Sequence, residues 1–386
     1  MPDIPLTLDD VTPQWLTEAL GENEGRIIRF SSEVVGEGAG FLGDIVRITP
    51  ETETGTIRPL ILKMPTATAN RRIGQMLGVY EREVRFYREL QPKVSIRTPM
   101  PFHCDMDESD PARSLKDLKL LKKLPVWLVK LLLPVVSRLA GNAGHRYVLL
   151  MEDLGPFRMG DQLSVCTQED AMMAVAALAK LHADFFEQDL SDYPWVIPFD
   201  LGARYLQIVM EKNYDEFCVR HQEIMSDQHR QILKWLLEHA EEFVRSIAQL
   251  PYTLLHGDYR PDNLCFDDGR GELIVMDWQT LLQGPIGVDV AYFIASTELD
   301  VPESELLEHY VRTMADSGVR MSPARIRFEY EMGVLASLQR IMLLGSDDVE
   351  FGEGRGPELL EQATMRFFKA AENINLDTLL QGQIPP

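Results

Sequence analysis

The period of the hydrophobic pattern changes partway along the chain, and this change limits the folds that are possible. Residues 27–65 contain β-branched apolar runs broken by glycine and by a polar turn, which predicts three strands of an antiparallel meander. Residues 169–188, 201–247 and 303–345 instead have apolar side chains at helical spacing. A strand-rich first part followed by a helix-rich second part predicts a two-lobed α+β fold.

The two lobes are expected to join near residues 151–157. We assign residues 1–151 to an N-terminal lobe with a helical insertion at about 112–144, and residues 152–386 to a C-terminal lobe. Further expected elements are helices over 7–20 and 71–91, the second ending before Pro92, and strands at 145–156, beside "LLHGD" and at "ELIVMDW".

The net charge of −22 excludes one class of partner. Nucleic-acid binding needs clustered Lys and Arg for the phosphates, so we expect no nucleic-acid partner. The charge is compatible with cationic substrates, but a solvated acidic surface is the simpler explanation.

Several features favour a cytoplasmic protein. The four cysteines lie far apart without a CxxC pair, as is usual for reduced thiols. The N-terminal residues lack the basic and apolar regions of a signal peptide, and no uncharged apolar run reaches eighteen residues. We therefore expect a cytoplasmic location.

The segment 113–139 differs from the rest of the chain because it has seven basic residues and one acid, Asp117. Three interpretations are open: a helical insertion packed on the lobe, which we favour, a helix that contacts a membrane surface, or a lid over an apolar substrate. Its apolar residues recur at roughly helical spacing, with proline breaks at Pro125 and Pro134: Leu115, Leu118, Leu121, Leu128, Leu132 and Val135.

The motif "HGDYRPDN" (256–263), followed by an apolar strand that ends in Asp277, suits phosphoryl transfer. That reaction needs in-line positioning, a divalent metal on the phosphates and an acceptor for the hydroxyl proton. Asp258 is a candidate for the last role, and the oxygens of Asn263 and Asp277 are hard ligands suited to Mg²⁺. Asp and Asn beside proline are also favoured turn residues, so the argument depends on the joint pattern. In a strand–loop–strand hairpin, Asn263 and Asp277 would meet at one end.

These residues resemble the loops of the aminoglycoside phosphotransferase and choline kinase superfamily, distant relatives of the protein kinases. The resemblance implies a protein-kinase-like fold, an ATP- and Mg²⁺-dependent kinase, Asp258 as the catalytic aspartate, and Asn263 and Asp277 as metal ligands. It also implies that His256 braces the loop and that Asp289, in "GVDVAYF", ties the loop down.

The first lobe carries matching candidates for nucleotide binding. Lys63 ends an apolar strand, and a buried ammonium needs an anionic partner. The resemblance implies that a helix glutamate is that partner. We prefer Glu83 to Glu81, because the family glutamate lies three residues before the tyrosine of an "FY" pair. In this chain Glu83 lies four residues before Tyr87, which differs from the family spacing by one residue. The glycines that would approach the phosphates are Gly36, Gly38 and Gly40.

"LLMEDLG" resembles the hinge that contacts adenine. The backbone from Glu152 to Leu154 would do this, with Met151 beside the ring, although we expect the side chain of Met151 to pack in the core as well. His182, in "LAKLHADFF", is expected to be structural.

The resemblance covers about residues 10–345 and is closest to the ecdysteroid-kinase-like branch. We expect an alcohol acceptor with an apolar body, of steroid, terpenoid or acyl type. A cationic acceptor and a pseudokinase that acts through a partner remain open. The aromatic residues of the acceptor region are more often core than lining: Trp195, Tyr205, Tyr214, Phe217, Trp235, Tyr310 and Tyr330.

Overall fold

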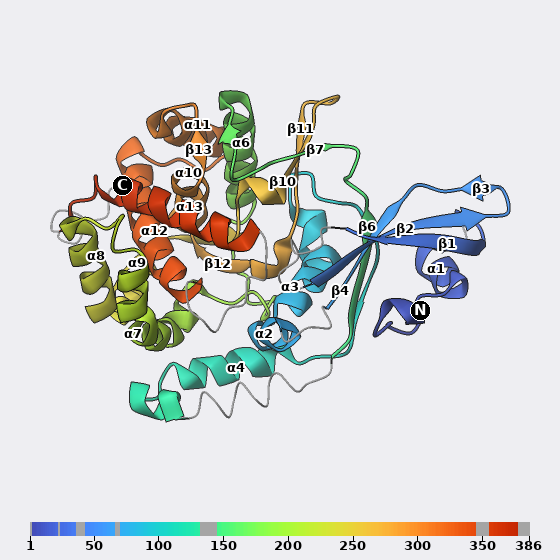
Figure 1. The fold of residues 1–386 in the computed structure, drawn as a ribbon, viewed down its shortest axis with the longest axis horizontal. Helices are drawn as coiled ribbons and strands as arrows, with labels where there is room; N and C mark the ends of the chain where they lie inside the picture. Colours follow the sequence, from blue (N-terminus) through green and yellow to red (C-terminus); the bar gives the residue numbers. More distant parts are fainter. Residues whose placement is uncertain are drawn as a thin grey trace.

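A computed structural model describes residues 2–21, 24–35, 43–65, 70–131, 145–344 and 355–376. One end of the molecule is an antiparallel sheet and the other is a group of helices, with α2 and α3 between them (Figure 1). This arrangement confirms the expected α+β fold class.

The N-terminal sheet contains the expected meander. Its strand order is β1-β2-β4-β6-β5 with antiparallel pairing, and β3 is added beside β2. One face is covered by α1 (Pro13–Leu20), whose Trp15 and Leu16 are buried in a cluster with sheet residues such as Leu62. The strands are β1 (Ile27–Val34), β2 (Gly43–Thr52), β3 (Gly55–Thr56), β4 (Leu60–Pro65), β5 (Pro101–Met106) and β6 (Tyr147–Glu152).

The two expected N-terminal helices are both shorter than predicted. The first begins at Pro13, where Thr12 caps it by accepting the N–H of Trp15, and Leu8–Asp10 form a separate 3₁₀ turn. The second breaks at Gly78, whose φ of 67° lies in the left-handed region. It is divided into α2 (Asn70–Leu77), α3 (Val79–Arg85) and a π-helical turn (Phe86–Leu90).

The C-terminal part is built around two closely packed helices, α10 and α12. A Cβ at Gly333 of α12 would lie 1.9 Å from the carbonyl oxygen of Gly287 in α10, so both backbones approach only because glycine is present. The helices are α6 (Gln168–Asp184), α7 (Ala203–Arg220), α8 (Asp227–Glu238), α9 (Ala240–Ile247), α10 (Gly287–Ser296), α11 (Glu303–Asp316), α12 (Pro323–Leu344) and α13 (Arg355–Ala371).

Most of the aromatic residues considered for an acceptor pocket belong to the core or lie half-buried beside it. Trp195, Phe217, Tyr310 and Tyr330 are buried, and Tyr205 is exposed. The other two, Tyr214 and Trp235, are half-buried against the same cluster. Core packing was therefore the better expectation.

Short strands hold the loops of the C-terminal part. The strand beside "LLHGD" pairs with β12 and not with the strand at "ELIVMDW", which forms a hairpin with β10. In this hairpin Leu264 lies opposite Val275, so Asn263 and Asp277 leave it at the same end. The strands are β7 (Arg158–Met159), β8 (Val165–Cys166), β9 (Tyr252–Leu255), β10 (Leu264–Asp267), β11 (Glu272–Val275), β12 (Leu282–Pro285) and β13 (Glu298–Leu299).

The basic insertion begins with α4 (Pro111–Leu121) and continues as helix at 126–131 (Figure 1). Lys122 pairs with Asp200, and Nζ of Lys130 lies 2.6 Å from Oε2 of Glu211. These ion pairs connect the insertion to the C-terminal part. Leu132 and Val135 lie outside the described residues. The exposed apolar side chains of the segment are Leu120, Trp127 and Leu131.

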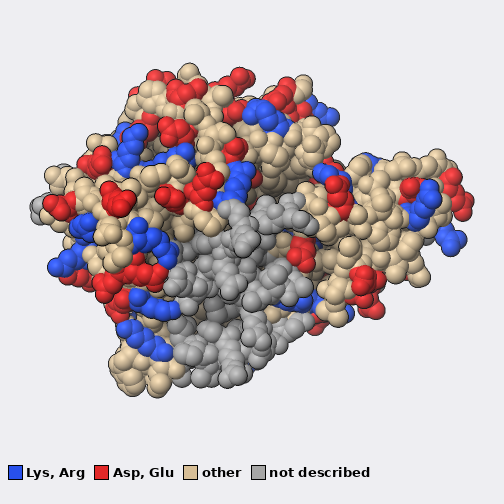
Figure 2. Space-filling model, viewed as in Figure 1, with Lys and Arg blue, Asp and Glu red and all other residues tan. Residues whose placement is uncertain are grey.

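Acidic and basic side chains are interspersed on the face shown in Figure 2. No helix among the described residues is long and apolar enough to cross a membrane.

Candidate functional site

The loop between β9 and β10 is held by a buried carboxylate. Oδ2 of Asp289 accepts the backbone N–H of His256 at 2.7 Å, and Oδ1 accepts that of Gly257 at 3.0 Å. Gly257 has a φ of 80°, and a Cβ there would lie 2.2 Å from the carbonyl oxygen of Thr280. A side chain at this position would therefore displace the loop.

His256 braces the loop through both ring nitrogens. Nδ1 accepts the backbone N–H of Asp258 at 3.2 Å, so the ring proton lies on Nε2, which is 2.9 Å from the carbonyl oxygen of Met276. The side chain is fully buried. His256 thus joins the loop to the end of β11, which is a structural role.

Asp258 is surrounded by donors. Its Oδ2 accepts hydrogen bonds from Nδ2 of Asn263 at 3.0 Å and Nε of Arg260 at 3.3 Å, and its Oδ1 accepts one from Nη2 of Arg340 at 3.0 Å. Burial raises the pKa of Asp258, but Arg260 and Arg340 outweigh it and lower the pKa to about 2. The group is therefore a carboxylate at neutral pH.

Asn263 and Asp277 lie together at one end of the β10–β11 hairpin. The backbone N–H of Met276 donates to the carbonyl oxygen of Asn263 at 3.0 Å, which fixes the two ends. Asp277 has a φ of 65°, a region that non-glycine residues seldom adopt, and its side chain is 37% exposed. The carboxylate therefore faces accessible space.

Lys63, in the sheet, contacts both Glu83 of α3 and Asp277, which follows β11. Its Nζ lies 2.8 Å from Oε1 of Glu83 and 3.3 Å from Oδ1 of Asp277. Burial lowers the pKa of Lys63, but the two carboxylates outweigh it and raise the pKa, so the ammonium stays charged. Glu81 instead accepts hydrogen bonds from Arg85 and Ser109.

Aromatic stacking holds the helix of Glu83 against the segment that follows Asp277. The ring of Trp278 stacks on Phe86 with centroids 3.9 Å apart and planes at 8°. In addition, Nε of Arg82 donates to the carbonyl oxygen of Gln279 at 3.0 Å. The stacking and the hydrogen bond therefore hold the segment of Glu83 and the segment of Asp277 together beside Lys63.

The backbone of the predicted hinge already makes hydrogen bonds within the protein. The amide of Glu152 already donates to the carbonyl oxygen of Met100 at 2.9 Å, and the carbonyl oxygen of Leu154 accepts the backbone N–H of Phe157 at 2.9 Å. Met151 is buried in the core cluster, and Gly36, Gly38 and Gly40 lie outside the described residues.

Two residues near the site were not singled out from the sequence. Arg340 contacts Asp258 from α12, and Trp278 stacks on Phe86. The only sequence signal for Arg340 is a charge inside an otherwise apolar run, "ASLQRIMLL". His182, by contrast, is structural as expected, since it is fully buried with Nδ1 2.7 Å from the hydroxyl of Tyr310.

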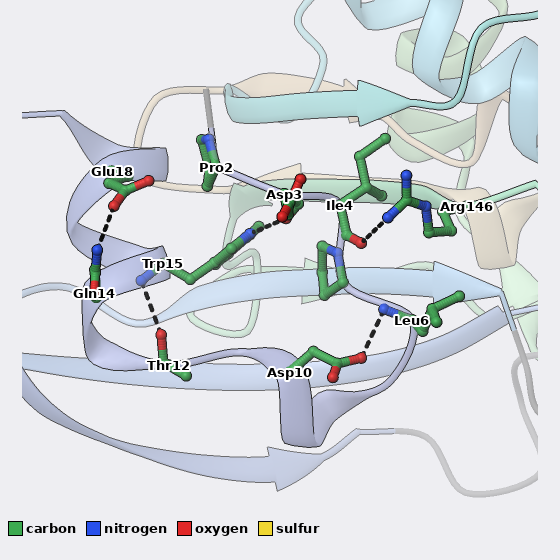
Figure 3. A pocket seen from close by; sticks show the side chains of 11 residues that line it. Pro2, Asp3, Ile4, Leu6, Asp10, Thr12, Gln14, Trp15, Glu18 and Arg146 are labelled. Atoms are coloured by element: carbon green, nitrogen blue, oxygen red, sulfur yellow. Dashed lines mark hydrogen bonds between the residues drawn. The ribbon is translucent and has the colours of Figure 1, made fainter.

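A cavity of about 350 Å³ lies away from these motifs, at the N-terminal arm (Figure 3). Nε1 of Trp15 donates to the carbonyl oxygen of Asp3 at 2.8 Å, and Arg146 donates to that of Ile4. These bonds fasten the arm to α1 and to the residue directly before β6. None of the motif residues lines this cavity.

Comparison with known proteins gives one family. Residues 51–316 match the model described as the phosphotransferase enzyme family, APH. No curated protein matches the sequence.

Solved structures resemble the chain over most of its length at low identity. A choline/ethanolamine kinase family protein from Mesorhizobium loti has 13% identity and a TM-score of 0.47, covering 94% of this chain and 95% of its own. A type I macrolide 2'-phosphotransferase has 15% identity and a TM-score of 0.48, with 92% and 98% covered. The choline kinase LicA from Streptococcus pneumoniae has 12% identity and a TM-score of 0.49, also with 92% and 98% covered.

Proposed function

The chain belongs to the phosphotransferase enzyme family and is a small-molecule kinase with the protein-kinase-like fold of that family, and we propose that it transfers the γ-phosphate of ATP to an alcohol with the help of Mg²⁺. In this proposal, nucleotide binds between an N-terminal lobe, residues 1–151, and a C-terminal lobe, residues 152–386. The closest branch would be the ecdysteroid-kinase-like one.

One observation carries the proposal: the ammonium of Lys63 is bonded both to Glu83 and to Asp277. Lys63 comes from the sheet, Glu83 from α3, and Asp277 from the far end of the β10–β11 hairpin. Lys63 therefore joins three parts of the molecule that a nucleotide would contact. Lys63 would bind the phosphates, with Glu83 orienting it.

The backbone near Leu154 would contact the adenine, beside Met151, while the Glu152 amide is occupied by Met100. Gly36, Gly38 and Gly40 would approach the phosphates.

The donor set of Asn263 and Asp277 fits Mg²⁺. The carboxamide nitrogen of Asn263 is bonded to Asp258, which leaves its oxygen as the candidate ligand, and Asp277 supplies a half-exposed carboxylate. Mg²⁺ in kinases is held by one or two such groups plus phosphate oxygens and water. When bound, the ion would neutralise charge on the phosphates.

Asp258 would orient the acceptor hydroxyl. Its low pKa makes it a weak base, so positioning is its main contribution and it receives the proton late in the reaction. The acceptor O–H bond breaks as the new O–P bond forms and the bond between Pγ and the ADP oxygen breaks. The proton passes to Oδ1 of Asp258.

We propose an acceptor with an apolar body of steroid, terpenoid or acyl type. A cationic acceptor, of the aminoglycoside or choline type, is the alternative. The guanidinium of Arg340 lies beside Asp258 and favours the apolar acceptor over the cationic one. A cationic acceptor whose hydroxyl reached Asp258 would be repelled by the like charge of Arg340. A pseudokinase is disfavoured by the complete set of Lys63, Asp258, Asn263 and Asp277.

The test is a screen of alcohols with γ-labelled ATP and Mg²⁺. Wild type should label a subset of apolar alcohols, and Asp258→Ala should bind nucleotide but lose nearly all transfer. Nucleotide binding without labelling of any alcohol would favour the pseudokinase. Transfer by Asp258→Ala at the wild-type rate would refute the assignment of Asp258.

A further inference from the structure

The guanidinium of Arg340 is fixed beside the carboxylate that we assign to the reaction. Nη2 lies 3.0 Å from Oδ1 of Asp258, and Nη1 donates to the carbonyl oxygen of Gly257. The group also lies over the ring of Tyr292, 4.2 Å from its centroid. These contacts come from the catalytic loop and from α10, so the guanidinium is held in place before any ligand arrives.

The two oxygens of Asp258 have different neighbours. Oδ2 is bonded by Asn263 and Arg260, whereas Oδ1 is bonded by Arg340. Since Asn263 is assigned to the metal, Oδ2 faces the phosphate donor. Oδ1 is then the atom that an acceptor hydroxyl reaches, and Arg340 lies on the acceptor side.

Arg340 can be reached by a ligand, because its side chain is 28% exposed. Among the residues that the structure describes, Asp258 is the acid within ion-pair distance of it, and Asp258 is already shared with Arg260. A guanidinium carries five N–H donors in a planar fork, which suits a carboxylate or a phosphate.

We propose that Arg340 binds an anionic group, a carboxylate or a phosphate, which the acceptor carries close to the hydroxyl that is phosphorylated. This inference rests on the proposed function and narrows its substrate class to an apolar alcohol with a nearby anion. A hydroxyl bonded to Oδ1 and an anion bonded to the same guanidinium lie within roughly 3–6 Å of each other. Acids with a 3- or 4-hydroxyl meet this requirement.

The selectivity test uses acceptors of one carbon skeleton: the 4-hydroxy acid, its methyl ester and the corresponding amine. Wild type should have a kcat/KM for the acid about 10- to 100-fold above that for the ester, and should use the amine least. Arg340→Met should remove the preference, Arg340→Lys should keep part of it, and Arg327→Met, a control elsewhere on α12, should keep all of it. Equal use of acid and ester by wild type, or an equal loss on both in Arg340→Met, would overturn the proposal.

A binding measurement separates this inference from the proposed function. The saturated acid without the hydroxyl cannot be phosphorylated, yet it should raise the thermal stability of wild type and of Arg327→Met and bind Arg340→Met about 10- to 100-fold more weakly. Such binding without any alcohol phosphorylation would support the anion site and contradict the kinase assignment. Phosphorylation of esters without binding of the acid would support the kinase assignment and contradict the anion site. If Arg340→Met does not fold, Arg340→Lys and Arg340→Gln give the same comparison.

Discussion

Nζ of Lys63 lies 2.8 Å from Oε1 of Glu83, while Glu81, two residues earlier on the same helix, points to Arg85 and Ser109. Substitution of Glu83 can therefore be compared with the same substitution at Glu81 as its control. Glu83→Gln should raise the KM for ATP about 10-fold or more, because Lys63 loses the nearer of its two carboxylate partners and its alignment with the phosphates. Glu81→Gln should change it less than about 2-fold, because the partners of Glu81 are Arg85 and Ser109 and not Lys63. ATP titrations of both variants measure this, and equal effects would contradict the pairing.

Asp289 holds the catalytic loop through two backbone N–H groups. In Asp289→Asn one of these buried donors faces an NH₂ group and loses its acceptor, so the free energy of unfolding should fall by about 1–3 kcal/mol. Asp316→Asn, on the exposed end of α11, should change it by less than about 0.5 kcal/mol. Urea unfolding measures both. A stable Asp289→Asn variant with unchanged kcat would show that the loop does not need this carboxylate.

Asp258 should stabilise the fold in a pH-dependent manner. Its folded pKa of about 2 lies below the ordinary 3.8, so its contribution is present above pH 3.8 and is lost as the pH falls toward 2. Asp258→Asn leaves Arg260 and Arg340 without their common partner and should lower the free energy of unfolding at pH 7 by on the order of 2 kcal/mol. The difference from wild type should shrink at pH 3. A difference that is the same at both pH values would mean that the arginines do not act on Asp258.

Strands β1, β2 and β4 could be predicted from sequence because their signals, β-branched runs between turns, are local. The meeting of Asn263 and Asp277 could be predicted because the outer ends of any hairpin lie together, although β10, the strand that pairs with β11, was not predicted. The break at Gly78 was missed, since an isolated glycine in a helical pattern is usually tolerated. Arg340 was missed for a different reason: its contact with Asp258 depends on how α12 packs against α10, through Gly287 and Gly333, and no local pattern records that packing.

The metal requirement should depend on Asp277 more than on any other acid of its hairpin. Asp277→Asn keeps the shape of the side chain but removes one negative charge from the proposed Mg²⁺ site, so half-maximal activity should need on the order of 10-fold more Mg²⁺. Asp268→Asn is the matched control, because that residue lies at the opposite end of the hairpin, 60% exposed, paired with Arg158. Titration of Mg²⁺ at saturating ATP compares the two. If both variants keep the wild-type Mg²⁺ dependence, Asp277 does not bind the metal, and its contact with Lys63 is its main role.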